Sequence, residues 1–222
     1  MDNPKYSIVL PCRNEETTIE ICIKKIKTSM KNLDYEIIVS DSSKDKSPEI
    51  AKKLGARVIK HNRYGYGIAC ILGINASKGG YIIMADADNS YDFLELPGFI
   101  KELEKGYDLI LSSRYKGEIK KGSMPWLHRY IGNPFLSFTL NKKFKTNFSD
   151  THSGFRAFTK EAFSRMDLKC NGMEFASEML IKAKKNSLKI KEIPITYWPR
   201  KGISKMRSFR DGFRHLLYIL RQ

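Results

Sequence analysis

In the first half of the chain, short apolar segments alternate with amphipathic ones, and this alternation limits the fold more than any other feature. The apolar segments are rich in β-branched and aromatic residues and end at glycine, proline or polar clusters, as buried strands do. The predicted strands are residues 6–12, 35–41, 56–61, 81–85 and 108–113. The predicted helices between them are residues 16–30, 47–55, 67–77 and 95–105. Such alternation predicts a doubly wound α/β sheet, mostly parallel, with helices on both faces.

Charged side chains follow directly after three of these strands. Asp41 closes the second strand, Asp86 and Asp88 follow the fourth, and Arg114 follows the fifth. In sheets of this kind, ligands bind outside the carboxyl ends of the strands. We therefore expect these four side chains to converge on one edge of the sheet, although they are far apart in the sequence.

The segment Asp86-Ala87-Asp88 is the best candidate for a metal site. Residues i and i+2 at a strand end share a face, so both carboxylates can point the same way. Two such charges repel each other unless a cation or hydrogen-bond donors lie between them. Mg²⁺ and Mn²⁺ prefer oxygen ligands and bind through one or two carboxylates plus substrate phosphates. The alternative is a strand end closed by a solvated turn.

The positive charge is concentrated in the second half of the chain. Residues 1–113 hold 16 Lys+Arg and 16 Asp+Glu, whereas residues 114–222 hold 24 and 8, so the second half carries the whole net charge of +16. This asymmetry favours a polyanionic partner, namely nucleic acid, an anionic membrane surface or a phosphorylated substrate. A lysine-rich surface without a partner is the alternative. Because the sequence has no helix-turn-helix, RRM or zinc signature, no nucleic-acid partner is expected.

Several common classes of protein are disfavoured by the sequence. It has no Gly-Lys-Ser/Thr phosphate loop, and its partial dinucleotide motif, GYGIAC at 65–70, follows the wrong strand. We interpret that motif as a helix start where small residues permit close approach. The four scattered cysteines predict reduced, mostly buried thiols. Without a signal peptide or a long apolar run, the chain is expected to be cytoplasmic.

The second half is less regular. Residues 124–144 predict two short helices broken at 132–134, residues 172–185 a helix, and residues 188–198 a strand. Residues 204–222 predict a helix with an apolar side and an arginine-rich side. The first and last of these segments are typical of helices in a membrane interface, or alternatively of ordinary core helices.

Seven short motifs occur in a characteristic order along the chain. They are PCRNEE (11–16), SDSSKD (40–45), DADNS (86–90), SSRY (112–115), DTHSGFRAF (150–158), GMEFASEM (172–179) and ITYWPRKGISK (195–205). Together they resemble the family-two GT-A glycosyltransferases, and among these the dolichyl-phosphate or polyprenyl-phosphate hexose synthases. The resemblance implies a GT-A fold, which is a Rossmann-like, doubly wound mixed sheet with helices on both faces, accompanied by amphipathic interface helices. We expect a single catalytic domain, 1–222, with a nucleotide-sugar-binding half (1–115) and a basic, acceptor- and membrane-facing half (116–222).

The resemblance also implies roles for particular residues on the donor side. The implied nucleotide-binding residues are Pro11, Arg13, Asn14, Glu15, Asp41, Arg63, Asp86 and Ala87. The implied ligands of a Mg²⁺ or Mn²⁺ cofactor are Asp86, Asp88 and Ser90. Where members of the family often have Asp-Asp-Gly, this chain has Ser-Asp-Ser at 40–42, so its recognition of the base departs from the family pattern.

On the acceptor side, the implied substrate is a lipid phosphate. It is already an anion, so it needs cationic positioning rather than a strong general base. The implied acceptor-phosphate residues are Arg114, Arg129, Arg200 and Lys205, and the implied catalytic residues are Asp88, Arg114, Asp150 and Arg156. Asp150 would orient the arginines or the sugar. Glu174 and Glu178 share a helix face and would contact the sugar, pair with arginines or simply face solvent.

The expected function is therefore metal-dependent, inverting transfer of a hexose to a dolichyl or polyprenyl phosphate. The donor is a nucleotide sugar, with UDP-glucose, UDP-N-acetylglucosamine and GDP-mannose left open, and the enzyme would be peripheral at the cytoplasmic face of the membrane. One alternative is a glycosyltransferase with a hydroxyl acceptor, for which Asp150 would be the base. A second alternative is a non-catalytic nucleic-acid-binding protein.

Overall fold

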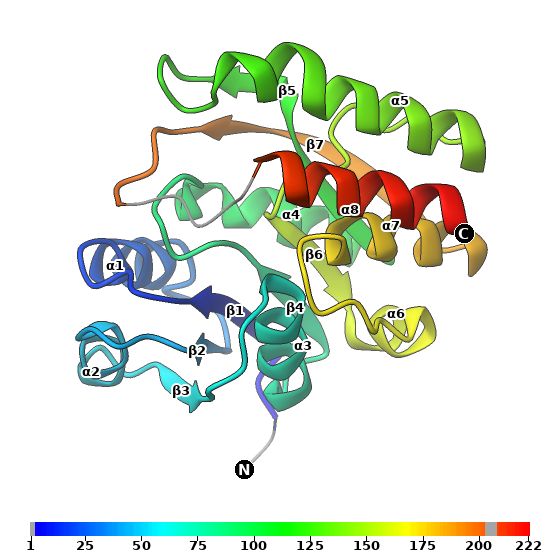
Figure 1. Cartoon of the computed structure of the whole chain (residues 1–222). Helices are drawn as coiled ribbons and strands as arrows, with labels where there is room; N and C mark the ends of the chain where they lie inside the picture. Colours follow the sequence, from blue (N-terminus) through cyan, green and yellow to red (C-terminus); the bar gives the residue numbers. More distant parts are fainter. Residues whose placement is uncertain (1–2, 203–207) are drawn as a thin grey trace.

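The computed structural model of the chain describes residues 3–202 and 208–222. In that part of the chain, seven strands form one sheet in the order β3-β2-β1-β4-β6-β5-β7 (Figure 1). The strands are β1 (Tyr6–Cys12), β2 (Tyr35–Asp41), β3 (Arg57–Lys60), β4 (Tyr81–Met84), β5 (Leu109–Ile119), β6 (Arg156–Thr159) and β7 (Ile190–Tyr197). All neighbours are parallel except β6, which runs antiparallel to both β4 and β5. The predicted doubly wound, mixed GT-A sheet is confirmed.

Helices cover both faces of the sheet. They are α1 (Ile19–Ser29), α2 (Ser47–Lys53), α3 (Tyr66–Ala76), α4 (Leu96–Glu104), α5 (Asn133–Phe144), α6 (Lys160–Met166), α7 (Phe175–Lys185) and α8 (Ser208–Arg221). Alternate strand residues feed two separate apolar cores, as the period of a strand requires. Ile8 packs into the core beneath α1, α2 and α4, while its neighbour Val9 packs into the core beneath α3 and α5–α8.

The strand β6 and the helix α6 were not among the predicted elements. The strand has only four residues and the helix seven, which is too short for a periodic signal to stand out from the surrounding loops. The insertion of β6 matters for the site because it is antiparallel. Its first residue, Arg156, lies opposite Met84 of β4 and Leu111 of β5. The loop before β6 therefore reaches the edge where β4 ends, beside the middle of β5.

Residues 124–144 differ from the prediction of two helices with a break between them. A π-helical turn, η2 (His128–Gly132), runs directly into α5 without interruption. Pro134 lies in the first turn of α5, where its missing N–H removes no intrahelical hydrogen bond. The proline marks the start of a helix here rather than the end of one.

The outer surfaces of η2, α5 and α8 carry unusually many exposed apolar side chains. We call this surface the aromatic face, and its residues are Trp126, Tyr130, Ile131, Phe135, Phe138, Phe209, Phe213 and Leu220. The inner side of α8 packs against α5 and α7 and buries His215 and Ile219 (Figure 1). In the part of the chain that the structure describes, no helix combines the length and apolarity that crossing a bilayer demands.

Candidate active site

The carboxyl ends of β1, β2 and β4 meet at one edge of the sheet, together with the loop before β6 and the middle of β5, which continues beyond Arg114 to Ile119. The register brings Cys12 at the end of β1 level with Asp41 at the end of β2. Arg200, which follows β7, reaches both Glu15 after β1 and Asp88 after β4. The predicted convergence of these charged side chains on one edge is therefore present in the structure.

Asp86 and Asp88 form a poorly compensated pair of carboxylates at this edge. Burial, followed by repulsion from Asp88, raises the pKa of the Asp86 carboxyl to about 7. Asp88 is 4% exposed, and its Oδ1 accepts hydrogen bonds from the backbone N–H and the hydroxyl of Ser90, at 2.9 and 2.5 Å. The Ser90 hydroxyl thus orients Asp88, and its assignment as a metal ligand gains no support from this geometry.

The donor set at this edge fits a divalent cation held jointly by the protein and a substrate. No cluster of three or more His, Cys, Asp or Glu side chains suited to a metal occurs within residues 3–202 and 208–222. Two carboxylates remain, Asp86 and Asp88, which is the number with which proteins usually hold Mg²⁺ alongside phosphate oxygens. Burial first and the charge of Asp88 second raise the pKa of Asp86, and a cation between the two carboxylates would offset both effects.

Arg200 supplies part of that positive charge in this structure. Its Nη2 lies 2.9 Å from Asp88 Oδ2 and 3.6 Å from Glu15 Oε1. Arg200 also lines a cavity of about 350 Å³ together with Lys25, Asn89, Trp198, Pro199 and Lys201. The predicted acceptor-phosphate residue Arg200 is therefore paired with donor-side carboxylates, while Lys205 lies outside the described residues.

Two loops on the donor side are tied together by the side chain and backbone of Asn14. The backbone N–H of Asn14 donates to Ser43 Oγ at 2.7 Å, and its Oδ1 accepts from the backbone N–H of Lys44 at 2.8 Å. Asn14 adopts a left-handed backbone conformation with φ 55°, which asparagine tolerates better than most residues. These bonds fix the loop after β1 to the loop after β2, which are the two segments expected to hold a nucleotide.

The other predicted nucleotide-binding residues lie around the same loops, and they differ in how far a ligand could reach them. Asp41 is fully buried and its Oδ2 is ion-paired with Lys60 Nζ at 2.9 Å, so Lys60 covers it. The Arg13 guanidinium lies over the Tyr64 ring at 4.6 Å. A cavity of about 480 Å³ opens here, lined by Asn62, Arg63, Tyr64, Ile68 and Asn171. Pro11 is part of β1, and the Ala87 carbonyl accepts from the Thr18 hydroxyl at 2.7 Å, inside the fold.

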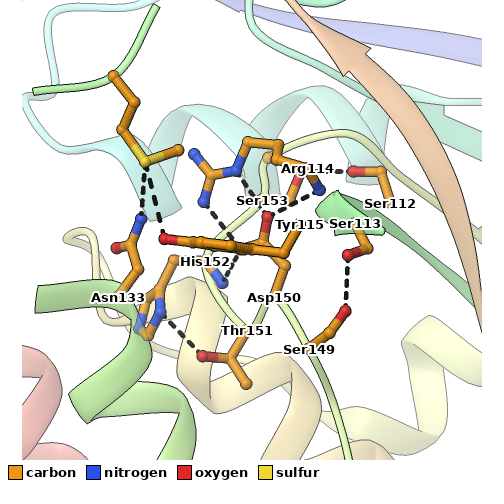
Figure 2. A network of polar contacts seen from close by, with 12 residues as sticks. Ser112, Ser113, Arg114, Tyr115, Asn133, Ser149, Asp150, Thr151, His152 and Ser153 are labelled. Atoms are coloured by element: carbon orange, nitrogen blue, oxygen red, sulfur yellow. Dashed lines mark hydrogen bonds and ion pairs between the residues drawn. The ribbon is translucent and has the colours of Figure 1, made fainter. Parts of the chain in front are cut away.

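On the acceptor side, Arg114 and Asp150 form a buried bidentate ion pair (Figure 2). Arg114 Nε donates to Asp150 Oδ2 at 2.6 Å, and Arg114 Nη2 donates to Oδ1 at 2.8 Å. Arg114 is 7% exposed and Asp150 1%. Burial alone would raise the pKa of the Asp150 carboxyl, but the charge and hydrogen bonds of Arg114 outweigh burial and hold that pKa below its ordinary value.

Neighbouring polar groups fix this pair from several sides. Glu192 of β7 accepts from the backbone N–H groups of Ser149 and Asp150, at 2.8 and 3.2 Å. The Tyr115 hydroxyl donates to the carbonyl of Arg129 at 2.8 Å, which joins η2 to β5. Only the backbone carbonyl of Arg129, a predicted acceptor-phosphate residue, takes part in this contact, and its guanidinium lies over the Tyr130 ring at 5.3 Å. Glu192 and Tyr115 were not predicted as site residues: Glu192 lies outside the seven motifs, and Tyr115 ends the motif SSRY, in which only Arg114 was given a role.

The prediction that Arg156 is catalytic is not supported by its position. Arg156 is 2% exposed, and its Nε, Nη1 and Nη2 donate to the carbonyls of Ser153, Ala176 and Thr151 at 2.8–2.9 Å. A guanidinium whose three nitrogens are bound to backbone carbonyls holds a loop in place and does not face a substrate. Arg156 thus fastens the loop before β6 to the first turns of α7.

Glu174 and Glu178 each have a partner elsewhere in the protein. Glu174 Oε1 is 2.7 Å from Arg214 Nη2 of α8, as one of the predicted possibilities required. Glu178 is 3% exposed and accepts from the backbone N–H groups of Lys169 and Cys170, at 3.0 and 2.7 Å. Glu178 therefore closes the loop before α7, which excludes the solvated-face interpretation for that residue.

A second set of residues that the sequence did not predict surrounds Asp86. A Cβ atom added to Gly154 would lie 3.0 Å from the Tyr66 hydroxyl, 3.1 Å from Asp86 Oδ2 and 3.4 Å from the Tyr91 hydroxyl. The Tyr91 hydroxyl accepts from the backbone N–H of Gly154 at 2.7 Å. Burial and then the charge of Asp86 raise the pKa of Tyr66 well above its ordinary value, so this hydroxyl keeps its proton next to the carboxylate.

The interpretation of the GYGIAC segment as a close-packed helix start is supported by the contacts of α3. The backbone N–H groups of Gly67 and Ile68 donate to the carbonyls of Gly172 and Asn171, at 3.2 and 3.1 Å. A Cβ atom on Gly67 would also lie 2.8 Å from the Phe175 Cβ atom. These glycines let α3 approach the 171–172 backbone, and the first N–H groups of α3 are used there rather than on a phosphate.

Comparison with known proteins agrees with this geometry. The model of a family described as "Glycosyl transferase family 2" matches residues 7–167. The low-salt glycan biosynthesis hexosyltransferase Agl6 of Haloferax volcanii is 44% identical over 220 residues, which are 98% of this chain and 53% of that protein. The chain thus spans about half the length of this relative. The dolichyl-phosphate hexose transferase of the same organism is 31% identical over 208 residues, 93% of this chain and 88% of that protein.

Among solved structures, a similar fold occurs in glucosyl-3-phosphoglycerate synthase from Mycobacterium tuberculosis, in complex with Mn²⁺, UDP and glucosyl-3-phosphoglycerate. The TM-score is 0.79 at 23% identity, and the match covers 98% of this chain and 79% of that one. At this identity the likeness shows the GT-A fold alone. The alternative of a non-catalytic nucleic-acid-binding protein does not hold for a member of a transferase family. Because the family model covers most of the chain and the relatives match nearly all of it, this chain belongs to glycosyl transferase family 2 and is a glycosyltransferase.

Proposed function

We propose that this glycosyltransferase moves a hexose, with inversion, from a nucleotide sugar to a dolichyl or polyprenyl phosphate, using Mg²⁺ or Mn²⁺. The observation that carries the proposal is the buried Arg114–Asp150 pair at the acceptor side of the edge. Arg114 would hold a guanidinium where an acceptor approaches the carboxylates assigned to the metal, and the next residue, Tyr115, binds the carbonyl of Arg129. A guanidinium in a fixed orientation is well suited to hold a phosphate.

The ion pair and the lowered pKa of Asp150 favour a phosphate acceptor over a hydroxyl acceptor. A hydroxyl must lose its proton to attack, which calls for a free carboxylate with a raised pKa. Asp150 has the opposite properties, since both of its oxygens accept from Arg114 and the pKa of its carboxyl is lowered. A lipid phosphate is already ionised and can attack through its own oxygen, so it needs no base from the protein. Asp150 is then the group that orients Arg114.

On the donor side, the proposal assigns the cation to Asp86 and Asp88. When bound there, a divalent ion would neutralise the diphosphate that leaves. The loops fixed by Asn14 and the cavity beside Arg63 would hold the nucleotide. Arg13 lies over the ring of Tyr64, which lines that cavity, and Glu15 belongs to the loop after β1. Arg200 would have to leave Asp88 when the cation binds, and would then be available to a phosphate of the donor or the acceptor.

The aromatic face supports an acceptor that is reached from a membrane surface. Monomeric soluble proteins seldom expose so many apolar side chains on adjoining helices. Trp126 is 66% exposed, Phe138 62% and Phe209 84%, and basic residues such as Lys142 and Arg210 lie beside them. Aromatic rings flanked by Lys and Arg suit the interface of a membrane with anionic lipid. We therefore propose a peripheral position at the cytoplasmic face, with the lipid phosphate entering from this side.

The relatives are consistent with this assignment. Their names describe hexose transfer in glycan biosynthesis and transfer to dolichyl phosphate. The related Mycobacterium tuberculosis structure contains Mn²⁺ and UDP. These properties belong to those proteins. The UDP in that structure makes UDP-linked hexoses the first donors to test here, with GDP-mannose, which the sequence leaves open, tested beside them.

The decisive experiment compares two acceptors that differ only in the phosphate. The purified chain is incubated with Mn²⁺, each nucleotide sugar in turn, and either polyprenyl phosphate or the corresponding polyprenol, and the sugar-bearing lipid is quantified. The proposal expects product with the phosphate, none with the alcohol, and loss of product when EDTA removes the cation. Transfer to polyprenol at a similar rate would instead establish a hydroxyl acceptor, and the absence of product with every donor would refute the proposal.

A further inference from the structure

Two histidines from distant parts of the chain meet inside the molecule, next to the acceptor side of the site. His152 belongs to the loop before β6, two residues after Asp150, and His215 lies on the inner side of α8. Their rings are in edge-to-face contact with centroids 4.4 Å apart. His215 is 6% exposed. His152 is half-buried. Two imidazoles in contact beneath the surface are unusual, because each brings polar nitrogens that need partners.

A chain of hydrogen bonds takes up both nitrogens of His152 and Nδ1 of His215, and it joins three elements. The Ser177 hydroxyl of α7 lies 2.8 Å from His215 Nδ1 and 3.4 Å from His152 Nε2. On the other side, His152 Nδ1 lies 2.8 Å from Thr151 Oγ1, which in turn is 2.9 Å from the Ser137 hydroxyl of α5. Figure 2 shows the part of this chain formed by His152 and Thr151, directly beneath Asp150.

The protons in this chain can be assigned consistently with both imidazoles neutral. His152 Nε2–H donates to the Ser177 oxygen, and the Ser177 hydroxyl donates to His215 Nδ1. The Thr151 hydroxyl donates to His152 Nδ1, and the Ser137 hydroxyl donates to Thr151. Each hydroxyl then donates once and accepts once. An interruption at Ser177 or His215 would leave a buried nitrogen or hydroxyl without its partner.

The same loop holds the Arg114–Asp150 pair. The backbone N–H of His152 donates to Asp150 Oδ1 at 3.3 Å, and Asp150 in turn fixes two nitrogens of the Arg114 guanidinium. Arg156 ties Thr151 to the carbonyl of Ala176, one residue before Ser177. The position of Arg114 therefore depends on a loop that is fastened to α7 and, through Ser177, to α8.

We propose that His215 of α8 is a positioning residue that acts through Ser177 and His152 to hold Asp150 and hence the guanidinium of Arg114. The helix that carries Phe209 and Phe213 on its outer side thereby takes part, through its inner side, in setting the geometry of the acceptor side of the site. This inference rests on the proposed function only in naming the phosphate as the group that Arg114 binds.

The first test measures the position of Arg114 directly and needs no substrate. The Nε–H proton of Arg114 is buried in the ion pair, so its exchange with solvent, followed by NMR, reports how firmly Asp150 holds it. The variants are His215→Leu, which fills the space without a nitrogen, and Ser177→Ala, which interrupts the chain and leaves both imidazoles. We expect about tenfold faster exchange in each. In His215→Asn, whose side-chain oxygen can replace Nδ1 as acceptor, exchange returns close to wild type.

A matched control separates this role from a general loosening of α8. Ile219→Val removes one buried methyl group from the same helix and touches no polar group of the chain. We expect Ile219→Val to lower the melting temperature about as much as His215→Leu does, and to leave the exchange of Arg114 Nε–H unchanged. The proposal is overturned if Ile219→Val accelerates exchange as much as His215→Leu does, or if neither His215→Leu nor Ser177→Ala accelerates it.

The second test measures acceptor use. With polyprenyl phosphate, His215→Leu and Ser177→Ala should raise the acceptor KM about tenfold and leave the donor KM unchanged. Equal changes in both constants would contradict a role at Arg114. If the wild-type enzyme uses no polyprenyl phosphate while the exchange result holds, the proposed acceptor is wrong and the positioning role of His215 stands.

Discussion

Arg200 Nη2 lies 2.9 Å from Asp88 Oδ2, so a cation of the protein occupies one side of the carboxylate pair that we assign to the divalent ion. The second contact of Arg200, with Glu15 at 3.6 Å, links the segment after β7 to the loop after β1. A divalent ion and a guanidinium cannot both compensate Asp88 fully. Donor binding should therefore be coupled to the release of Arg200.

Removal of the Arg200 charge should strengthen the binding of the free cation and weaken transfer. In Arg200→Met, Mn²⁺ no longer competes with an ion pair, and we expect about fivefold tighter binding in the absence of nucleotide, measured by electron paramagnetic resonance. Lys201→Met removes an equal charge from the neighbouring exposed residue and should leave Mn²⁺ affinity unchanged. Weaker Mn²⁺ binding in Arg200→Met would contradict the competition.

Asp150→Asn should cost stability as well as activity, because it leaves Arg114 buried without its counter-charge. The loss of free energy of unfolding should be roughly 3–5 kcal/mol, measured by denaturant titration. Replacing both partners, as Arg114→Met with Asp150→Leu, should recover much of that stability without recovering transfer. A fall in kcat with normal stability in Asp150→Asn would point instead to a general base and a hydroxyl acceptor.

The histidine pair makes stability depend on pH in a defined direction. Burial, and then His215, Arg114 and Arg156, hold the pKa of His152 well below its ordinary value. Burial, and then Arg156 and Arg214, lower the pKa of His215 to about 3. Below the ordinary histidine pKa of about 6.5 the unfolded chain binds protons that the folded chain does not, so stability is complete above pH 6.5 and falls as the pH decreases.

Between pH 6.5 and 5, each histidine should lower the free energy of unfolding by up to about 1.4 kcal/mol per pH unit. Urea titrations at several pH values measure this slope. The variant His215→Asn carries one titrating group fewer and should show a shallower slope over the same window. An unchanged slope would mean that His215 does not stay neutral in the folded protein.

The fold was largely predictable because the first half of the chain is built from local signals. Strands such as Tyr6–Cys12 and Tyr35–Asp41 are apolar runs flanked by turn residues, and helices such as Ile19–Ser29 show apolar residues at helical spacing. The strand β6 could not be seen in the same way. Its four residues are a strand only because β4 and β5 lie on either side of it.

The site residues also fall into those predictable from the local sequence and those that are not. Asp86 and Asp88 were predictable because they follow a strand, and strand ends meet at one edge of such a sheet. Arg114 was expected just after the fifth strand, but β5 continues to Ile119, so Arg114 lies inside it, where the pairing with β7 is irregular. The environment of Arg156 could not be predicted, since its partners are backbone carbonyls of two other segments. The pairing of Arg200 with Asp88 is also set by tertiary structure, across 112 positions of the sequence. The positions of charged residues in the sequence thus predict which edge of the sheet carries the site. The role of each residue depends on contacts between distant segments, which leave no pattern in the local sequence.

Gly154 should be essential for the arrangement around Asp86. In Gly154→Ala, the new methyl group would lie 3.0 Å from the Tyr66 hydroxyl and 3.1 Å from Asp86 Oδ2, so these groups must shift by a few tenths of an ångström. We expect about tenfold weaker binding of Mn²⁺ with nucleotide, measured by calorimetry. The control is Gly80→Ala, where the added atom has nothing within 4 Å. Equal binding by both variants would show that Asp86 tolerates the displacement.

The aromatic face should bind membranes, and its phenylalanines should contribute most of the affinity. Phe138→Ser on α5 and Phe213→Ser on α8 each remove an exposed ring, 62% and 60% exposed, so neither change opens a cavity in the core. Each should weaken binding to vesicles that contain anionic lipid by about tenfold, measured by sedimentation, with little change in melting temperature. Added salt should weaken the binding of the wild type as well, since lysines and arginines on these helices contribute.

Leu94→Ser is the matched control for this experiment, because Leu94 is 49% exposed on the 3₁₀ turn η1 (Phe93–Glu95), which is not part of the aromatic face. It should bind vesicles as the wild type does. If Leu94→Ser weakens vesicle binding as much as the phenylalanine variants, the contact with lipid is not confined to the aromatic face. If none of the three variants changes it, the exposed rings of α5 and α8 face something other than a membrane, and the entry of a lipid phosphate from that side has to be abandoned.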